Sequence, residues 1–257
     1  MKVVLLAGGV GTRISEETEY RPKPMIEIGG MPILWHIMKE YSFYGFNEFI
    51  ICAGYKQELI KKWFADYFFY TSDITVDLRQ GNCVTIHKQE TEPWIVTIAD
   101  TGADTKTGGR IKRIQKYVGN ETFMVTYGDG VCDVDLKDLV TFHHEHGKKA
   151  TLTSVVQEQS KGTLDIGNDN SVRAFREKKN KDETMINAGY MVFEPAVFDY
   201  FIDDNTILET DVLSGLAKTG ELMSYSHHGF WQCMDTIYEK NRLERMIRKG
   251  NAPWIKW

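Results

Sequence analysis

The chain is poor in cysteine and has no long apolar segment. Its cysteines lie far apart in the sequence and none forms a C-x-x-C pair, which argues against a disulfide framework or a zinc cluster. They are Cys52, Cys83, Cys132 and Cys233. The apolar run that starts at Val3 ends before Gly8, far short of the roughly 20 residues that a spanning helix needs and too short for a secretory signal. We therefore expect a cytoplasmic protein that does not enter a membrane.

The sequence also lacks an excess of positive charge. Its 257 residues carry a formal net charge of −5 at pH 7. Nucleic acids and anionic membrane surfaces favour basic proteins, so neither is expected as a partner. Repeats, low-complexity stretches and Pro/Ser-rich linkers are absent from the sequence, and the apolar content of 42% is typical of a globular protein. A single domain over residues 1–257 is therefore predicted.

Strands and helices alternate from residue 3 to residue 156. The apolar run Val3 to Ala7 predicts a strand that is buried on both faces, as in a parallel sheet. Further strands are expected within 46–55 and over 123–126 and 150–156, and helices over 32–44, 57–68, 107–118, 135–146 and 236–249. Turn residues at 167–170 indicate a hairpin. This order predicts an α/β fold: a doubly wound, mainly parallel (Rossmann-like) mixed sheet with helices on both faces and small β-hairpin additions.

A glycine-rich loop follows the first strand. Glycine allows the backbone to approach a ligand closely, so that successive amides can point at phosphate oxygens. Ligands in open α/β sheets bind beyond the carboxyl ends of the strands, which is where this loop and Gly128 are expected. Arg13 and Lys23, the latter within RPKP, add cations suited to phosphate. The candidate nucleotide-binding residues of the loop are Leu6, Ala7, Gly8, Gly9, Gly11, Thr12 and Arg13.

Two other phosphate-binding patterns do not fit the loop. The nucleotide-hydrolase pattern G-x-x-x-x-G-K-[ST] does not occur in the sequence. The dinucleotide pattern G-x-G-x-x-G would start at Gly9 and Gly11 but finds Ile14 in its third position, which disfavours a nicotinamide-dependent oxidoreductase. A non-catalytic binding module on the same fold is a further alternative. The presence of candidate catalytic cations and carboxylates disfavours it.

Two aspartates are candidate ligands for Mg²⁺. Asp129 follows the strand over 123–126, on the same rim as the glycine loop, and Asp235 lies in WQCMDT. Magnesium prefers hard oxygen ligands and keeps several waters, so two carboxylates with phosphate oxygens are sufficient. Either aspartate could instead be a turn residue or a helix cap. The pair His227-His228 has no third ligand at a suitable spacing in the sequence.

The segments L-A-G-G-x-G-T-R and P-K-P-M resemble the signature of the sugar nucleotidyltransferases, also called nucleotide-sugar pyrophosphorylases. The resemblance extends over essentially the whole chain. TYGDGV, TGGR-KR and FWQ-MDT are most similar to the cytidylyl branch, whose substrates are CTP and glucose 1-phosphate. The resemblance implies a homo-oligomeric enzyme that uses Mg²⁺ and releases pyrophosphate. Another sugar phosphate stays open, because Lys161, Lys179 and Ala188 depart from the family pattern around the acceptor. Another nucleoside triphosphate stays open as well, because the choice of cytosine rests on the resemblance alone.

The resemblance also suggests roles for individual residues. It places the metal at Asp129 and Asp235, and a base-reading segment at Thr107, Gly108, Gly109 and Arg110. A sugar phosphate is already largely dianionic at neutral pH, with a second pKa of about 6, so it can attack without a general base. We expect Arg13 to hold the β- and γ-phosphates and Lys23 to stabilise charge on the α-phosphate and the leaving group. The candidate sugar-phosphate ligands are Tyr127, Glu177, Lys178 and Asn187.

Overall fold

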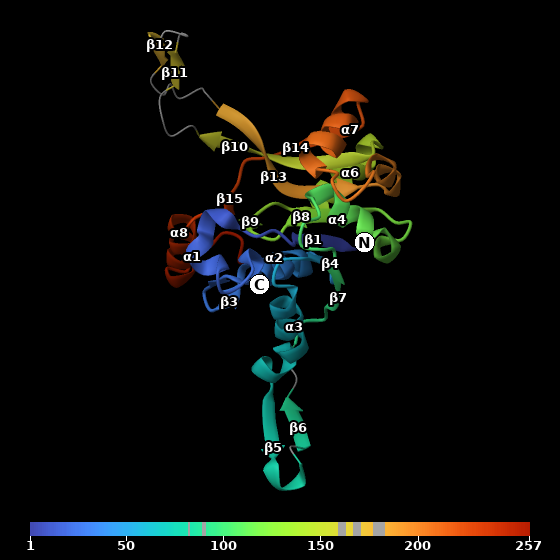
Figure 1. Ribbon diagram of the computed structural model, residues 1–257, viewed down its shortest axis with the longest axis vertical. Helices are drawn as coiled ribbons and strands as arrows, with labels where there is room; N and C mark the ends of the chain where they lie inside the picture. Colours follow the sequence, from blue (N-terminus) through green and yellow to red (C-terminus); the bar gives the residue numbers. More distant parts are fainter. Residues whose placement is uncertain (82, 89–90, 159–162, 167–170, 177–182) are drawn as a thin grey trace.

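A seven-stranded sheet runs through the centre of the molecule (Figure 1). The computed structural model describes residues 1–81, 83–88, 91–158, 163–166, 171–176 and 183–257. The strand order is β14-β10-β13-β8-β1-β4-β7. The strands are β1 (Val3–Ala7), β4 (Glu48–Ala53), β7 (Ile95–Asp100), β8 (Phe123–Tyr127), β10 (Ala150–Glu158), β13 (Glu183–Phe193) and β14 (Leu222–His227). Only β13 runs antiparallel to its neighbours, β10 and β8, which confirms the predicted mainly parallel mixed sheet.

Helices cover both faces of this sheet, as predicted. Val3 and Leu5 of β1 pack in one buried cluster with Ile33 and Ile37 of α2 (Ile33–Phe43). Val4 faces the opposite cluster, which contains residues of α4 (Thr107–Arg113), α5 (Gln115–Val118) and α7 (Ser214–Lys218). The strand is thus covered on both sides, which explains its unbroken apolar run. Among the described residues, no helix has the length and apolarity to cross a bilayer.

The remaining helices follow local sequence signals. They are α1 (Ser15–Thr18), α3 (Gln57–Thr71), α6 (Leu136–His146), α8 (Ile237–Arg248), the short 3₁₀ segments η1 (Thr12–Ile14), η2 (Lys23–Met25), η3 (Leu78–Gln80) and η4 (Pro195–Tyr200), and the π-helix η5 (Leu208–Leu213). Asp135 caps the start of α6, and Gly147 ends it with a left-handed φ of 62°. Thr236 and Glu239 form a capping box at the start of α8. These ends agree with the predicted helix boundaries to within about two residues.

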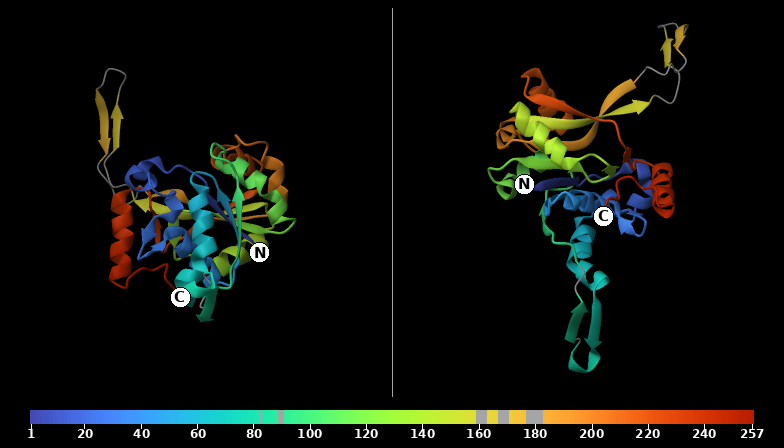
Figure 2. Two further views of the ribbon diagram at one scale, coloured as in Figure 1. Left: turned by 60° about the horizontal axis from the view of Figure 1, so that its bottom comes forward. Right: turned by 180° about the vertical axis from the view of Figure 1, so that it is seen from behind.

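Two hairpins project from the body of the molecule, as the right-hand view in Figure 2 shows. One pairs β5 (Asp73–Asp77) with β6 (Cys83–Lys88) and was not predicted. The other pairs β11 (Thr163–Ile166) with β12 (Val172–Arg176), on either side of the predicted turn at 167–170, which lies outside the described residues. Smaller pairs are β2 (Glu27–Ile28) with β3 (Met31–Pro32), and β9 (Gly130–Cys132) with β15 (Trp231–Cys233).

Candidate functional site

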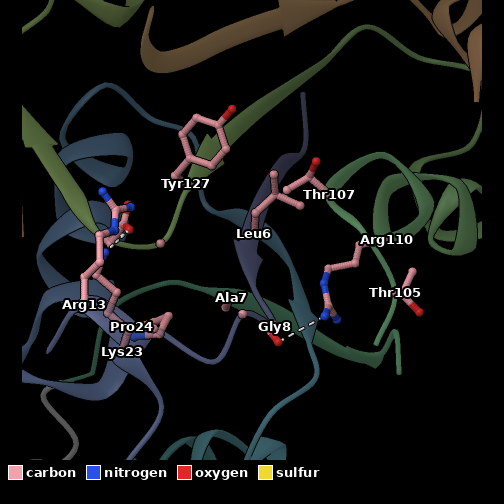
Figure 3. Close-up of a pocket in the computed structure, with 14 residues that line it drawn as sticks. Leu6, Ala7, Gly8, Arg13, Lys23, Pro24, Thr105, Thr107, Arg110 and Tyr127 are labelled. Carbon is pink, nitrogen blue, oxygen red and sulfur yellow. Dashed lines mark hydrogen bonds and ion pairs between the residues drawn. The ribbon is translucent and has the colours of Figure 1, made fainter. Parts of the chain in front are cut away.

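A cavity of about 340 Å³ opens where β1 and β8 end (Figure 3). The glycine loop from Gly8 to Gly11 forms one part of its wall, and Tyr127, Gly128 and Asp129 form another. Both wall segments directly follow parallel strands that pair with each other. The cavity therefore lies at the carboxyl edge of the sheet, the position at which open α/β folds bind ligands.

Lys23 is the centre of an ionic cluster at one end of this cavity. Its Nζ lies 2.5 Å from Oδ2 of Asp129 and 2.6 Å from Oδ1 of Asp235. Arg13 contacts the other oxygen, Oδ2, of Asp235 at 2.8 Å. Asp129 follows β8, whereas Asp235 is brought in by β15, which pairs with β9 so that the amide of Met234 donates to the Asp129 carbonyl at 2.8 Å. The structure thus brings together all four side chains that were predicted to act in phosphate chemistry.

Lys23 and Asp235 favour each other's charged forms. Burial alone would lower the pKa of Lys23, but the carboxylates of Asp129 and Asp235 raise it above its ordinary value. Burial alone would raise the pKa of Asp235, but Lys23 and then Arg13 lower it. Lys23 is therefore an ammonium and Asp235 a carboxylate throughout the neutral pH range.

The two aspartates also form a donor set that fits a hard cation. Ligand atoms of Asp129, Asp235 and Cys233 lie within 4.8 Å of one another. Burial raises the pKa of the Cys233 thiol, so this sulfur stays protonated and is unsuited to Mg²⁺. The carboxylate oxygens already attract one cation, the ammonium of Lys23. Two carboxylates beside a cavity large enough for phosphate oxygens and water are the ligands that Mg²⁺ prefers.

Arg110 holds the glycine loop in place from behind. Its buried guanidinium donates to the carbonyl oxygens of Gly8, Gly102 and Ala103 at 3.0, 2.6 and 3.0 Å. A Cβ atom on Gly8 would lie 2.2 Å from Nη1 of Arg110, whereas a Cβ on Gly9 would have no atom within 4 Å. The close approach of Arg110 therefore favours glycine at position 8, and Arg110 uses its Nη donors on these carbonyl oxygens and on Oγ1 of Thr101 at 2.8 Å.

The predicted base-reading segment is divided between the cavity and the protein interior. Thr107 lines the cavity. Gly109 faces the loop that contains Asp204, because a Cβ there would lie 2.5 Å from the Asp204 carbonyl oxygen, and Gly108 is packed in the same way against Thr206. These glycines thus have a packing role that requires no ligand. The nucleotide-binding role of Gly109 stays a prediction.

The remaining predicted residues differ in whether they line the cavity. Gly128 lines it and donates its amide to the Leu6 carbonyl at 3.0 Å, while Thr12 begins η1 between the loop and Arg13. Asn187 accepts the amide of Gly189 at 2.9 Å, and Gly189 contacts the ring of Tyr127. The candidate sugar-phosphate ligands Glu177 and Lys178 lie outside the described residues.

Glu209 was not predicted as a site residue from the sequence. This residue of η5 accepts hydrogen bonds from the hydroxyl groups of Tyr127 and Thr107, both of which line the cavity. It lies in the segment LETD, which carries no recognisable motif. Its partners are 82 and 102 residues away in the chain, so only the folded structure identifies it.

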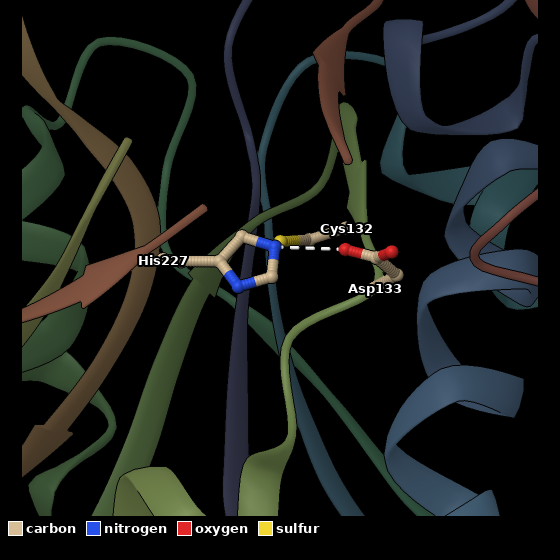
Figure 4. Close-up of side chains that lie close together, drawn as sticks. All are labelled: Cys132, Asp133 and His227. Atoms are coloured by element: carbon tan, nitrogen blue, oxygen red, sulfur yellow. Dashed lines mark hydrogen bonds and ion pairs between the residues drawn. The ribbon is translucent and has the colours of Figure 1, made fainter. Parts of the chain in front are cut away.

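A second group of potential ligands lies at the Cys132–Trp231 end of the β9–β15 pair, opposite to the Gly130–Cys233 end that leads to Asp129 and Asp235 (Figure 4). The sequence shows no third ligand for His227 and His228 at a suitable spacing, but in space Cys132 and Asp133 offer ligand atoms within 4.8 Å of one another and of His227. Oδ1 of Asp133 already pairs with Nε2 of His227 at 2.8 Å and accepts the amide of Phe230 at 2.6 Å. Burial raises the pKa of the Cys132 thiol and keeps it protonated. These contacts close the turn between His227 and Phe230.

A glycine loop, paired cations and two carboxylates at the carboxyl edge of an α/β sheet define a site for nucleoside phosphates. The family model described as Nucleotidyl transferase matches residues 2–236, and the chain belongs to this family. It is an enzyme of the nucleotidyltransferase class, which confirms the resemblance seen in the sequence.

Two curated relatives match over their whole lengths. The chain is 52% identical over 258 residues to the glucose-1-phosphate cytidylyltransferase of Salmonella typhimurium, with 100% of both proteins covered. It is 44% identical over 258 residues to the probable glucose-1-phosphate cytidylyltransferase of Bacillus subtilis, again with 100% of both covered. Among solved structures, HddC from Yersinia pseudotuberculosis has a TM-score of 0.69 at 22% identity, over 96% of this chain and 99% of that one. This likeness shows the shared fold.

Proposed function

We propose that the enzyme transfers the cytidylyl group of CTP to glucose 1-phosphate and so forms CDP-glucose and pyrophosphate. The observation that carries the proposal is the convergence of Lys23, Arg13, Asp129 and Asp235 beside the glycine loop. The full-length identity of 52% to the Salmonella typhimurium enzyme supports the choice of substrates.

The chemistry requires alignment and charge neutralisation more than proton transfer. An oxygen of the sugar phosphate forms a bond to the α-phosphorus of CTP, and the bond from that phosphorus to the oxygen shared with the β-phosphate breaks. Pyrophosphate leaves with the electron pair. Arg13 and the loop amides would hold the β- and γ-phosphates, and Lys23 would stabilise charge on the α-phosphate as the bonds change. No protein base is needed, because the attacking phosphate is already an anion.

We further propose that Asp129 and Asp235 hold Mg²⁺ when CTP is bound. The two cations and two carboxylates of the cluster cancel in formal charge, so these side chains alone give the cleft little net attraction for a triphosphate. A bound divalent cation would supply the missing positive charge and would neutralise the phosphate oxygens during the transfer.

Pyrophosphate release, measured over a matrix of four nucleoside triphosphates and several sugar 1-phosphates, tests the substrates. We expect CTP with glucose 1-phosphate to give the highest kcat/KM. A higher value with another nucleotide or another sugar phosphate would replace that member of the pair while leaving the reaction class intact. Chelation by EDTA is expected to abolish pyrophosphate release, and added Mg²⁺ is expected to restore it. Undiminished activity in EDTA would refute the proposed requirement for Mg²⁺.

We also propose that the enzyme is a cytoplasmic homo-oligomer. The β5–β6 hairpin presents an apolar face formed by the cross-strand pairs of Ile74 with Ile86 and Val76 with Val84, each of them 39–44% exposed. A two-stranded hairpin is at best marginally stable by itself in water, so a second copy of the chain is a suitable cover. The widely spaced cysteines favour a reducing compartment.

Sedimentation analysis tests this interface. The double substitution Val76→Asp and Ile86→Asp is expected to lower the measured mass to that of a smaller species. Thr85→Asp changes the opposite face of the same hairpin and serves as the matched control. A monomeric wild-type enzyme, or an assembly that both variants leave intact, would exclude the hairpin as the interface.

A further inference from the structure

Glu209 lies behind the part of the cavity wall that Tyr127 and Thr107 form. Its Oε1 accepts a hydrogen bond from the Tyr127 hydroxyl, and its Oε2 accepts one from Oγ1 of Thr107 at 2.9 Å. One carboxylate thereby connects the end of β8 to the first residue of α4. Glu209 belongs to η5, a π-helix, and this rare geometry occurs frequently at functional sites.

The direction of these hydrogen bonds determines what the wall can offer to a ligand. A carboxylate only accepts, and each hydroxyl group has a single proton, so both protons point toward Glu209. Oγ1 of Thr107 also accepts the amide of Leu208 at 2.9 Å. Burial and the nearby Glu209 carboxylate raise the pKa of Tyr127, which therefore keeps its proton at neutral pH. Both residues line the cavity, and each hydroxyl oxygen keeps acceptor capacity after these bonds, so a ligand group bound to either oxygen has to be a donor.

The position of this wall suggests which part of the ligand it meets. Figure 3 shows Thr107 and Arg110 at one end of the cavity and Arg13 and Lys23 at the other. Since Arg13 and Lys23 belong to the proposed phosphate site, the nucleoside would extend toward Thr107. Both Nη atoms of Arg110 donate to main-chain oxygens and to Oγ1 of Thr101, so these two atoms add no free donor to this end.

We propose that Glu209 is a positioning residue that determines base specificity, because it fixes Tyr127 and Thr107 as acceptors for the 4-amino group of cytosine. Uracil carries a carbonyl acceptor at the same ring position, so acceptor would face acceptor and both would lose their hydrogen bonds. Sites built to bind a polar group by hydrogen bonds can reject an analogue that lacks it by about 10⁴–10⁵-fold. This inference rests on the proposed use of CTP.

Glu209→Gln gives the sharpest test. The oxygen of a glutamine amide can accept from one of the two hydroxyl groups, but its NH₂ group donates toward the other. That second hydroxyl then directs its own proton elsewhere and can become a donor toward the base. We expect the ratio of kcat/KM for CTP to kcat/KM for UTP, measured by pyrophosphate release with glucose 1-phosphate, to fall by about tenfold or more. Both nucleotides are compared with the same sugar phosphate, so a contact between Tyr127 and the sugar would not by itself change this ratio.

Asp211→Asn is the matched control, because Asp211 belongs to the same π-helix but its carboxylate accepts the amide of Ile207 at 2.7 Å. Its nucleotide ratio should equal that of the wild type. The inference would be overturned if Glu209→Gln lost activity equally with CTP and UTP. It would also be overturned if Asp211→Asn shifted the nucleotide ratio by the same amount, or if Glu209→Gln left the ratio unchanged and altered only the KM for glucose 1-phosphate.

Tyr127→Phe provides a second variant if Glu209→Gln does not fold. It keeps the ring that packs on Gly189 and removes one acceptor, so the same ratio should fall, and an unchanged ratio would refute the proposal. The wild-type enzyme separates the two levels of inference. A wild type inactive with CTP removes the proposed function and the role of Glu209 together. An active wild type that does not distinguish CTP from UTP removes only the proposed role of Glu209.

Discussion

Replacing Lys23 by alanine removes the ammonium that lies between Asp129 and Asp235. Its Nζ is 2.5 and 2.6 Å from their oxygens, and its side chain is only 9% exposed, so water cannot readily replace it. In the proposed reaction, the same group stabilises charge that develops on the phosphates. Loss of one such preorganised group typically costs about 10²–10³ in kcat, so we expect a decrease of that size.

The variant should nevertheless fold. The carboxylates that lose their partner are 25% and 20% exposed and can be partly hydrated, and Arg13 still pairs with Asp235. We therefore expect unfolding to become easier by about 1–3 kcal/mol, less than the loss of a fully buried pair. For a chain of this size, that corresponds to a decrease in Tm of roughly 2–12 °C. A folded fraction near one at 25 °C cannot account for a hundredfold loss of turnover.

The assay is steady-state pyrophosphate release at saturating CTP and glucose 1-phosphate, with thermal unfolding followed in parallel. Lys39→Ala is the control, because Lys39 also forms a half-buried ion pair, at 3.3 Å with Glu92, but does not line the cavity. It should lose stability without a comparable loss of kcat. A kcat for Lys23→Ala within about threefold of the wild type would remove Lys23 from the mechanism, since the reasoning requires at least about a hundredfold loss.

Two further predictions concern packing and a buried acid. Gly8→Ala places a methyl group 2.2 Å from Nη1 of Arg110 and should weaken CTP binding and lower Tm. Gly9→Ala, whose methyl group has no atom within 4 Å, should lower Tm little, and equal losses of Tm in thermal unfolding would refute this account. Glu40 is fully buried beside the hydroxyl of Tyr190, and burial raises its pKa well above 4.5. The folded protein then binds a proton that the unfolded chain releases, so the wild type loses stability relative to Glu40→Gln as pH rises, by about 1.4 kcal/mol per pH unit above the unfolded pKa. Denaturant unfolding between pH 5 and 8 measures this difference, and a constant difference would contradict it.

The sequence predicted the sheet best where each strand is buried by the chain around it. β1 is an unbroken apolar run because helices cover both of its faces. The β5–β6 hairpin was missed, although Ile74 and Val76 alternate with polar residues as strand residues do. This hairpin packs mainly on itself and has no core to impose a recognisable pattern. The reversed direction of β13 was equally unpredictable, because strand direction depends on long-range connections.

Residues of the site were predictable where their position follows from strand ends. Asp129 and the glycine loop share a rim because β8 and β1 are parallel neighbours. The partners of Arg110 and Glu209 were not predictable, since their contacts to Gly8 and Thr107 each span 102 residues. Arg110 was expected to lie in the base-reading segment; its guanidinium binds main-chain oxygens and Oγ1 of Thr101, and its role toward the base stays a prediction. The chemical type of a side chain suggested that it would bind something, but only the tertiary structure identifies what it binds.

The ionic cluster draws its members from widely separated parts of the chain, and this affects when activity can arise. Lys23 is 106 residues from Asp129 and 212 residues from Asp235. Asp235 reaches its place only after β15 has paired with β9. With Asp235 in its proposed role, a nascent polypeptide on the ribosome cannot turn over CTP before residue 235 has emerged and folded back onto the earlier strands. Premature termination upstream of that point would leave a fragment that retains the glycine loop and Lys23 yet lacks half of the carboxylate pair.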